Sequence, residues 1–181
     1  MSKLKKPKKV KLVIAIFSQN IEMLNVTQKE LASKYGIVDY TSNDLDFTET
    51  NYYNNEMGDN LKIRFLSFQK RVDRSKLPRV KLFCLKLEKK HSVDGGEKIK
   101  RTVNIDPGLL SLENFILSTG KPYSHRIYLD KGVWAEITLI FKKDHYAELE
   151  WTYPNYKSDK VKEILLKIRK IYHNQLMNDE K

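Results

Sequence analysis

Cysteine is nearly absent from this chain of 181 residues, in which Cys84 stands alone. A single cysteine excludes an intramolecular disulfide, and no cysteine or histidine spacing indicates a metal site. The sequence therefore predicts no metal ligands, and it leaves any cofactor unknown. It also favours a reducing compartment, and we expect a cytoplasmic protein.

Long apolar runs are missing as well. No window reaches the ~18 consecutive apolar residues that indicate a transmembrane helix. The N-terminus has the order of a signal peptide, because several lysines precede the apolar run Val10 to Phe17. However, Lys11 interrupts that run, and no small-residue cleavage site follows it. We therefore interpret residues 1–9 as a basic, flexible tail before a buried first strand.

Motifs with a known chemistry form the third absence. A serine nucleophile elbow, H-E-x-x-H and C-x-x-C do not occur in the sequence. The pair Gly95-Gly96 is too sparse to form a phosphate-binding loop. No segment therefore identifies a reaction.

Positive charge is what the sequence does have. Its 34 Lys and Arg residues exceed its 23 Asp and Glu residues, which gives a formal net charge of +11. Such a surplus favours attraction to nucleotides, nucleic acid or anionic lipid. A lysine-rich surface that serves solubility alone is the alternative. The 40% hydrophobic content agrees with a globular fold.

Hydrophobic periodicity predicts an α+β fold with a single domain, residues 10–177, followed by a short tail, residues 178–181. The first part of this domain alternates in the order strand, helix, strand, strand, helix, strand, which indicates a ferredoxin-like βαββαβ core. The predicted elements are a central strand over 11–17, a helix capped at Thr27 and ended by Gly36, an extended segment over 37–50, a strand over 61–72, a helix over 78–92 and a strand over 98–106.

The second part of the domain is predicted to add an antiparallel β-meander and a long C-terminal helix. Residues 112–117 are predicted to form a short helix, and strands over 124–129 and 133–141 then form a hairpin. A third strand follows over 146–151. Residues 158–177 have the apolar stripe of a long amphipathic helix. No internal repeat or low-complexity linker indicates a second domain.

The predicted hairpin carries the densest cluster of functional side chains. Its turn is Asp130-Lys131-Gly132, across which Leu129 pairs with Val133. In that register one face is polar and aromatic and carries Arg126, Tyr128, Trp134 and Glu136. The opposite face packs into the core and carries His125, Ile127 and Leu129.

Arg126 lies directly opposite Glu136 in this register, and the pair has two interpretations. As a structural element, opposite charges across a hairpin contribute ~0.2–1 kcal/mol and need no function. As a functional element, an arginine held by a carboxylate and flanked by aromatic rings is suited to bind a phosphate or a flat base.

Three side chains are candidates for acid–base catalysis: Asp106, His125 and Glu136. Asn104 and Asp106 project from one side of a strand that we expect to end at Pro107-Gly108. A carboxylate at such a sheet edge can serve as a general base, whereas turn formation is the structural alternative. A histidine on a core face is usually structural, but a register slip of one residue would bring His125 to the polar face.

The remaining candidates are ligand-binding residues outside the hairpin: Arg101, Lys121, Trp151, Tyr153 and Tyr156. Lys121 follows Thr119-Gly120 and could reach a phosphate. The last three aromatic residues could form a stacking wall for bases. Equally, they could pack the C-terminal helix against the sheet.

Several segments together resemble a known family: Glu56-Met57-Gly58, Arg64-Phe65-Leu66-Ser67-Phe68, Asn104-Ile105-Asp106-Pro107-Gly108, His125-Arg126-Ile127-Tyr128-Leu129, Ala135-Glu136-Ile137-Thr138-Leu139 and Trp151-Thr152-Tyr153-Pro154. This combination resembles the prokaryotic family known as domain of unknown function 4416. The likeness runs from about Lys8 to Tyr172. It implies a compact single-domain protein of about this length and no established activity.

Three functional hypotheses follow. The first is a binding module for a phosphate-bearing ligand, a nucleotide or RNA, that uses Arg101, Lys121, Arg126, Trp134 and the tyrosines. The second is a small enzyme that acts on a phosphorylated substrate, with Asp106 or Glu136 as base, His125 as acid or base, and Arg126 holding the anion. This enzyme hypothesis expects His125, Asp106 and Glu136 to converge on one pocket. The third is a structural or partner-binding protein without catalysis. The oligomeric state is not predicted.

Overall fold

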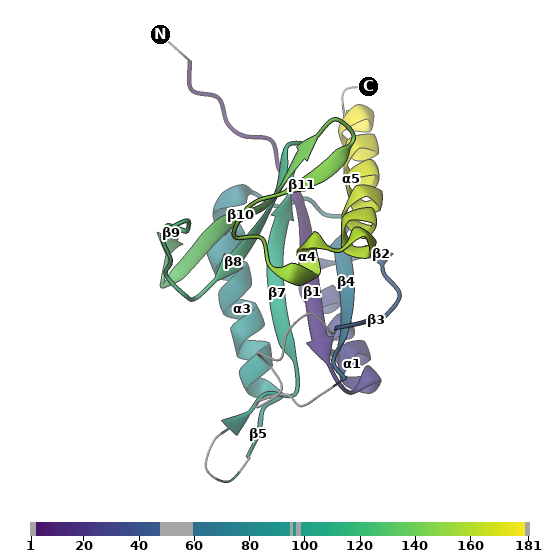
Figure 1. Ribbon diagram of the computed structural model, residues 1–181, viewed down its shortest axis with the longest axis vertical. Coiled ribbons are helices and arrows are strands. Elements are labelled where there is room, and N and C mark those ends of the chain that lie inside the picture. Colours follow the sequence, from purple (N-terminus) through teal and green to yellow (C-terminus); the bar gives the residue numbers. More distant parts are fainter. Residues whose placement is uncertain (1–2, 48–59, 95, 97–98, 180–181) are drawn as a thin grey trace.

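The computed structural model describes residues 3–47, 60–94, 96 and 99–179. In this part of the chain a main sheet has the strand order β11-β10-β8-β7-β1-β4-β2, with β3 paired to β4 and β9 paired to β10 (Figure 1). The Glu56-Met57-Gly58 segment and residues 48–50 of the expected extended segment lie outside the described residues.

The strands of the main sheet are β1 (Lys11–Ser18), β2 (Val38–Thr41), β3 (Leu45–Asp46), β4 (Lys62–Phe68), β7 (Asn104–Leu110), β8 (Asn114–Thr119), β9 (Ile127–Asp130), β10 (Val133–Lys142) and β11 (His145–Glu148). A separate small sheet pairs β5 (Val93–Asp94) with β6 (Ile99–Lys100). The helices are α1 (Ile21–Tyr35), the 3₁₀ turn η1 (Arg74–Lys76), α3 (Leu77–Lys90), α4 (Pro154–Lys157) and α5 (Asp159–Asp179).

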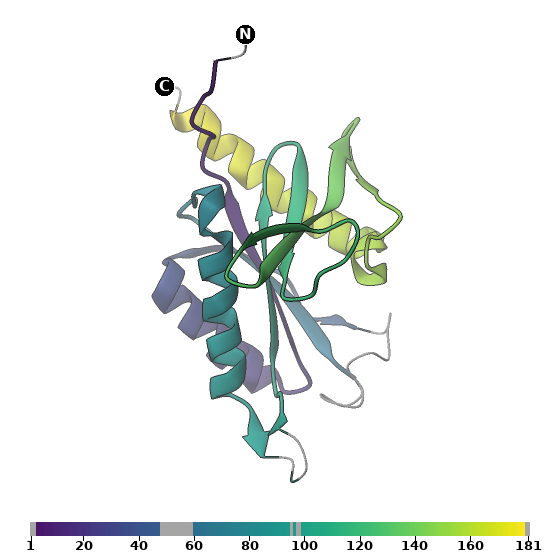
Figure 2. The same cartoon turned by 90° about the vertical axis from the view of Figure 1, so that its left-hand side faces the viewer.

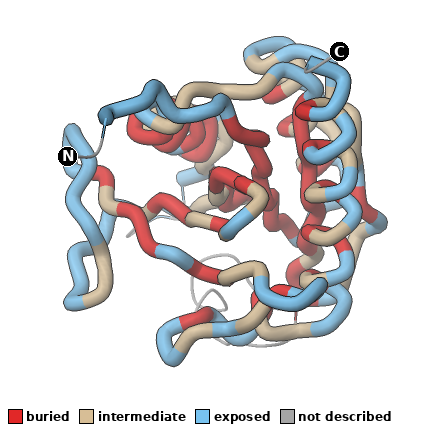
Figure 3. The backbone as a smooth tube through the Cα atoms, turned by 90° about the horizontal axis from the view of Figure 1, so that it is seen from above, coloured by how far each residue is buried: buried red, intermediate tan, exposed pale blue. Residues whose placement is uncertain are grey.

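Helices cover both faces of the sheet. α1 and α3 pack on one face, where Leu24, Leu31, Val80 and Cys84 join the apolar side chains of β1 and β4. α5 packs on the other face through the apolar stripe that its sequence predicts. Figure 1 shows the sheet between α3 on one side and α5 on the other, and Figure 2 shows the molecule from the side of α3, with α5 behind the sheet. Figure 3 shows the buried backbone between these helices from above.

β1 is the central strand that its apolar run predicts. All eight of its residues are buried, and it pairs antiparallel with β4 on one side and β7 on the other. The following helix begins earlier than we expected. Asn20 is its N-cap and accepts a hydrogen bond from the backbone N–H of Glu22 at 2.8 Å, whereas Thr27 lies buried inside the helix. Gly36 ends the helix as predicted.

The prediction of a short helix over residues 112–117 is wrong, because this segment contributes to strand β8. β8 lies between β7 and β10, and its two faces contact different hydrophobic clusters. Phe115 and Leu117 pack toward α5, while Ile116 packs toward α3. A strand buried on both faces loses the alternation of apolar and polar residues, and its apolar spacing then resembles that of a helix.

Pro107-Gly108 does not end its strand, contrary to our expectation, because β7 continues to Leu110. The two residues mark the end of the β7–β8 ladder instead. β7 and β8 pair from Gly108–Leu117 onward, whereas Pro107 pairs only with Ile14 of β1. Ser118 Oγ donates to the Pro107 carbonyl at 2.8 Å, so the polar backbone edge of Pro107 faces β8. Since proline has no N–H to donate there, β7 and β8 separate beyond this point.

The observed fold is therefore α+β, with a main sheet in which every pairing is antiparallel. The β-meander and the C-terminal helix are present as expected. The strand order along the whole sheet differs from that of a four-stranded ferredoxin-like sheet. The ferredoxin-like core remains a prediction.

Candidate functional site

A cavity with a volume of about 630 Å³ lies where β7 and β8 separate. This size is typical of small-molecule sites, which span roughly 300–1,000 Å³. The predicted residues among its lining are Arg101, Asn104, Asp106, Lys121, Arg126, Glu136, Tyr153 and Tyr156. Of the three residues that the enzyme hypothesis expects in one pocket, Asp106 and Glu136 line this cavity and His125 does not.

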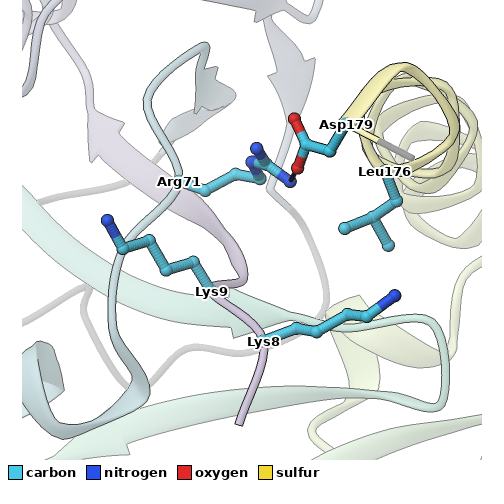
Figure 4. A pocket seen from close by; sticks show the side chains of 5 residues that line it. All are labelled: Lys8, Lys9, Arg71, Leu176 and Asp179. Carbon is cyan, nitrogen blue, oxygen red and sulfur yellow. Dashed lines mark ion pairs between the residues drawn. The ribbon is translucent and has the colours of Figure 1, made fainter. Parts of the chain in front are cut away.

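A second, smaller hollow of about 290 Å³ lies beside the C-terminal end of α5. Figure 4 shows that Arg71 points toward Asp179, with which it forms an ion pair at 2.5 Å, while Lys8 and Lys9 extend in different directions. Its cations do not converge on one point, so the larger cavity is the better candidate.

Arg126 and Glu136 form the ion pair that the hairpin register predicts, with 2.8 Å between Arg126 Nε and Glu136 Oε2. The pair is not on an exposed hairpin face, because the Glu136 side chain is only 2% exposed. A β-bulge between Ile137 and Leu139 changes the alternation of β10, so Glu136 and Leu139 both face the side of α5. The register pair Tyr128–Trp134 is confirmed, whereas Val133 pairs with Asp130 and not with Leu129.

The prediction that one face of the hairpin packs into the core is wrong for the first strand of the hairpin. Ile127 is 69% exposed and Leu129 is 39% exposed, because β9 pairs only with β10 in the described part of the chain and all four of its residues are exposed. His125 is not in the core either. It precedes β9 in a turn, and its ring stacks on Trp151 with 4.8 Å between centroids.

This turn lets two consecutive residues reach one carboxylate. The backbone N–H of Arg126 donates to the Tyr123 carbonyl at 3.1 Å, which closes the turn around His125. His125 Nε2 then lies 2.9 Å from the same Oε2 atom of Glu136 that Arg126 contacts. His125 does not line the cavity, so it contacts Glu136 from outside the lining.

The guanidinium of Arg126 is held by two further hydrogen bonds. It donates through Nη1 to the Lys121 carbonyl at 2.9 Å and through Nη2 to the Tyr153 hydroxyl at 3.1 Å. Burial lowers the pKa of Arg126, but its hydrogen bonds to Glu136 and Tyr153 outweigh burial and raise the pKa above its ordinary value. A fixed, permanently charged guanidinium therefore lines the cavity.

The two carboxylate oxygens of Glu136 differ in their hydrogen bonding. Oε2 accepts from Arg126 and His125, but Oε1 is buried and has no hydrogen-bond partner among the described residues. A buried acceptor without a donor costs roughly 1–3 kcal/mol, and more when it is charged. This cost is borne within the protein, because Oε1 is buried and is not exposed to the cavity.

A second charged cluster enters the cavity from α3. Lys81 Nζ donates to Asp106 Oδ1 at 3.0 Å and to the Ile105 carbonyl at 3.1 Å. Asn104 Nδ2 donates to Asp106 Oδ2 at 3.0 Å, so Asn104 and Asp106 share one side of β7 as predicted. Arg101 Nη1 continues the chain of contacts to Asn104 Oδ1 at 2.8 Å.

Glu88 closes this cluster. It accepts a hydrogen bond from the Ile105 backbone N–H at 2.7 Å and lies 3.5 Å from Arg101 Nη1. Burial raises the pKa of Glu88. Burial also lowers the pKa of Lys81, but Asp106 and Glu88 outweigh that effect, so the pKa of Lys81 lies above its ordinary value. Lys81 is therefore a buried cation and not a neutral amine nucleophile.

Lys81 and Glu88 were not among the sequence candidates, although the sequence contains a signal for them. They share a helical stripe with two apolar residues at spacings of four, three and four: Leu77, Lys81, Cys84 and Glu88. All four are buried on α3. Two charges on the buried stripe of a helix need partners in the core, and such groups mark candidate sites.

Four predicted residues lie outside the cavity lining: His125, Tyr128, Trp134 and Trp151. Tyr128 and Trp134 form an edge-to-face pair on the hairpin. Trp151 donates through Nε1 to the Ile137 carbonyl at 2.9 Å. Tyr156 lines the cavity but packs against Phe65 and Phe115, which agrees with its structural interpretation.

Over the described residues, no group of three or more His, Cys, Asp or Glu side chains is arranged to hold a metal ion. The same residues contain no helix with the length and apolar character needed to cross a membrane.

Comparison with known proteins identifies a family but no activity. No curated protein matches the chain, and no solved structure does. One family model matches residues 8–172, which include every residue of the cavity described above. The chain therefore belongs to the family described as domain of unknown function DUF4416.

Proposed function

We propose that the chain binds a small phosphate-bearing ligand, such as a nucleotide, in the cavity between α3, β7, β8 and β10. The observation that carries this proposal is the Arg126 guanidinium, which is held in the cavity wall by Glu136, Lys121 and Tyr153. A planar guanidinium already fixed in position loses little side-chain entropy when it binds an oxyanion.

The charge balance of the lining supports an anionic ligand. The cavity is lined by four basic side chains, Lys81, Arg101, Lys121 and Arg126, and by three acidic ones, Glu88, Asp106 and Glu136. A phosphate group in this cavity would therefore meet a positive potential.

The apolar part of the lining supports a ligand with a flat, weakly polar portion. Phe17, Phe47 and Leu117 line the cavity together with Tyr153, which is 48% exposed. Aromatic side chains bind nucleobases by stacking, at about 1–3 kcal/mol for each base. A nucleotide combines both requirements, and single-stranded RNA is the larger ligand that shares them.

Isothermal titration at low salt with AMP, ATP and inorganic pyrophosphate tests this proposal. Lys121→Met should weaken AMP binding by about 10- to 100-fold, because a hydrogen bond to a charged group is lost. Lys142→Met is the matched control, since Lys142 is an exposed lysine outside the cavity lining. The absence of binding to every probe would contradict the proposal, as would equal losses in the two variants.

An oligonucleotide separates the two ligand classes. If the ligand is RNA, a single-stranded oligomer should bind more tightly than AMP, and its affinity should fall steeply as salt rises. A mononucleotide site would bind AMP and the oligomer with similar affinity per site.

One observation favours a second candidate function, a small enzyme that acts on a phosphorylated substrate. Two of the three predicted catalytic residues, Asp106 and Glu136, line the same cavity as Arg126. In this alternative Glu136 is the base and His125 orients it. Phosphate release from p-nitrophenyl phosphate or AMP should then fall by about 10²-fold or more in Glu136→Gln. Wild-type protein that releases no phosphate from either compound would reject this alternative.

A further inference from the structure

We propose that Asn155 recognises the base of a nucleotide in this cavity, by pairing its side-chain amide with the polar edge of the base. The inference rests on the proposed function and narrows the ligand from phosphate-bearing compounds to nucleotides. Three features of Asn155 carry it: the burial of the residue, its place in the cavity lining, and a side-chain amide that has no hydrogen-bond partner among the described residues.

The side-chain amide of Asn155 is accessible to a ligand. The residue is only 8% exposed, and it lines the cavity. Its amide has no hydrogen-bond partner among the described residues, but it is not one of the polar groups that are sealed from solvent without a partner, as Oε1 of Glu136 is. The amide therefore keeps access to solvent, and since Asn155 lines the cavity, we place this access on the cavity side.

Contacts on both sides hold the backbone of Asn155 in position on α4. Its carbonyl oxygen accepts a hydrogen bond from Ser158 Oγ at 2.8 Å. The next residue, Tyr156, is anchored in the core by ring contacts with Phe65 and Phe115. A polar group on a fixed backbone loses less entropy when it binds a ligand, so Asn155 is suited to recognition.

The residues around this amide favour a base as its partner. Tyr153 lies two residues before Asn155, and its hydroxyl accepts a hydrogen bond from Arg126 Nη2 at 3.1 Å. The ring of Tyr153 lines the cavity and is 48% exposed, so it offers a stacking surface between the proposed phosphate-binding arginine and α4. A sugar phosphate without a base has no flat aromatic face for this ring.

The hydrogen-bonding groups of an asparagine amide match the edge of a base. The amide presents one donor group next to one acceptor oxygen. Each nucleobase also presents a donor next to an acceptor, and asparagine pairs with adenine through two such hydrogen bonds. Asn155 can therefore satisfy its amide with a base whose phosphate is bound by Arg126.

The first test uses wild-type protein alone. Isothermal titration at low salt compares AMP, GMP, CMP and UMP with ribose 5-phosphate and inorganic pyrophosphate. At least one of the four nucleotides should bind about tenfold or more tightly than ribose 5-phosphate, which has the sugar and the phosphate but no base to stack or to pair with Asn155.

The second test changes the hydrogen bonding of Asn155 and keeps its shape. A carboxylate in Asn155→Asp only accepts hydrogen bonds, so it favours guanine, which has two adjacent donors at N1 and N2, over adenine, whose single amino group lies between acceptor nitrogens. The ratio of GMP affinity to AMP affinity should rise by about tenfold or more over that of the wild type. This ratio is independent of the general loss that the added negative charge causes for both nucleotides.

Asn174→Asp is the matched control, because it makes the same chemical change at an exposed position of α5 outside the cavity lining. It should leave the ratio of GMP affinity to AMP affinity unchanged. Asn155→Ala is the second variant at the site, and it should weaken the tightest nucleotide by about tenfold while ribose 5-phosphate changes by less than about threefold. Thermal unfolding of each variant establishes that it is folded.

The outcomes separate this inference from the function on which it rests. If no probe binds the wild type, the proposed function fails and the inference fails with it. If ribose 5-phosphate binds the wild type as tightly as the best nucleotide, the phosphate site stands and recognition of a base is refuted. The role of Asn155 is also refuted if Asn155→Asp changes the ratio of GMP affinity to AMP affinity no more than Asn174→Asp does.

Discussion

The buried pair of Lys81 and Asp106 predicts that a second substitution restores part of the stability that the first one removes. Lys81 is 7% exposed and Asp106 is 26% exposed, so the two partners differ in their access to water. Asp106→Asn leaves the lysine charge buried without its nearest carboxylate, and removing one partner of a buried pair costs roughly 3–5 kcal/mol. Glu88 lies near the same lysine and places the expected loss at the lower end, about 3 kcal/mol.

Asp106→Asn also creates a conflict between donors. Lys81 donates to one oxygen of Asp106, and Asn104 donates to the other. An asparagine amide replaces one of these acceptors with an NH₂ group, so one donor must face another in either amide orientation. Lys81→Met has a smaller effect, about 1–2 kcal/mol, because Asp106 keeps its bond to Asn104 and is partly solvated.

The double variant provides the decisive comparison. Adding Lys81→Met to Asp106→Asn removes the uncompensated buried charge, so the second substitution should raise the free energy of unfolding of the first. Urea unfolding followed by circular dichroism measures this as a higher midpoint at an unchanged slope. If the double variant is less stable than Asp106→Asn alone, or if Lys81→Met costs as much as Asp106→Asn, the reasoning is refuted.

Three other predictions concern the fold around the site. Gly108→Ala should lower the free energy of unfolding by about 1–3 kcal/mol in a urea titration, because the added Cβ would lie 2.6 Å from the Ile116 carbonyl oxygen. Gly120→Ala is the control, because its added Cβ would meet nothing within 4 Å. Leu139→Ala should cost about 2–5 kcal/mol, whereas Ile127→Ala should stay within about 0.5 kcal/mol, and equal effects would contradict the assignment of hairpin faces. Burial raises the pKa of Glu88, so the native state binds the Glu88 proton more tightly than the unfolded state does. The free energy of unfolding should therefore fall as the pH rises from 4.5, the ordinary pKa of a glutamate, through the raised pKa of Glu88. Thermal midpoints between about pH 4 and 8 should show this fall in the wild type and a weaker one in Glu88→Gln.

The sequence predicts two kinds of element well: helices that bury a single face, and short strands in which every residue is buried. α5 has a continuous apolar stripe, and β1 is a short apolar run that ends at Ser18. β8 was missed because its two faces meet different layers, and α1 was shortened because Asn20 and Thr27 are both good N-caps. Local pattern cannot separate such alternatives, since tertiary packing decides between them.

Much of the site could be predicted because its residues are close in sequence. Arg126 and Glu136 come from one hairpin, and Asn104 and Asp106 come from one strand. The pairing of Asp106 with Lys81 could not be predicted, because 25 residues separate them and the contact depends on the opening between β7 and β8. Pro107 is the local cause of that opening. We expected the strand itself to end at Pro107, whereas only its pairing with β8 ends there.

The two carboxylates on the cavity wall differ in a way that assigns their roles. Both oxygens of Asp106 already accept hydrogen bonds, one from Lys81 and the other from Asn104. Glu136 has one oxygen held by Arg126 and His125 and the other without a donor among the described residues. Asp106 has internal partners for both oxygens and contributes to stability, whereas Glu136 holds the guanidinium of Arg126 in the cavity wall. Asp106→Asn should therefore act mainly on unfolding and Glu136→Gln mainly on binding.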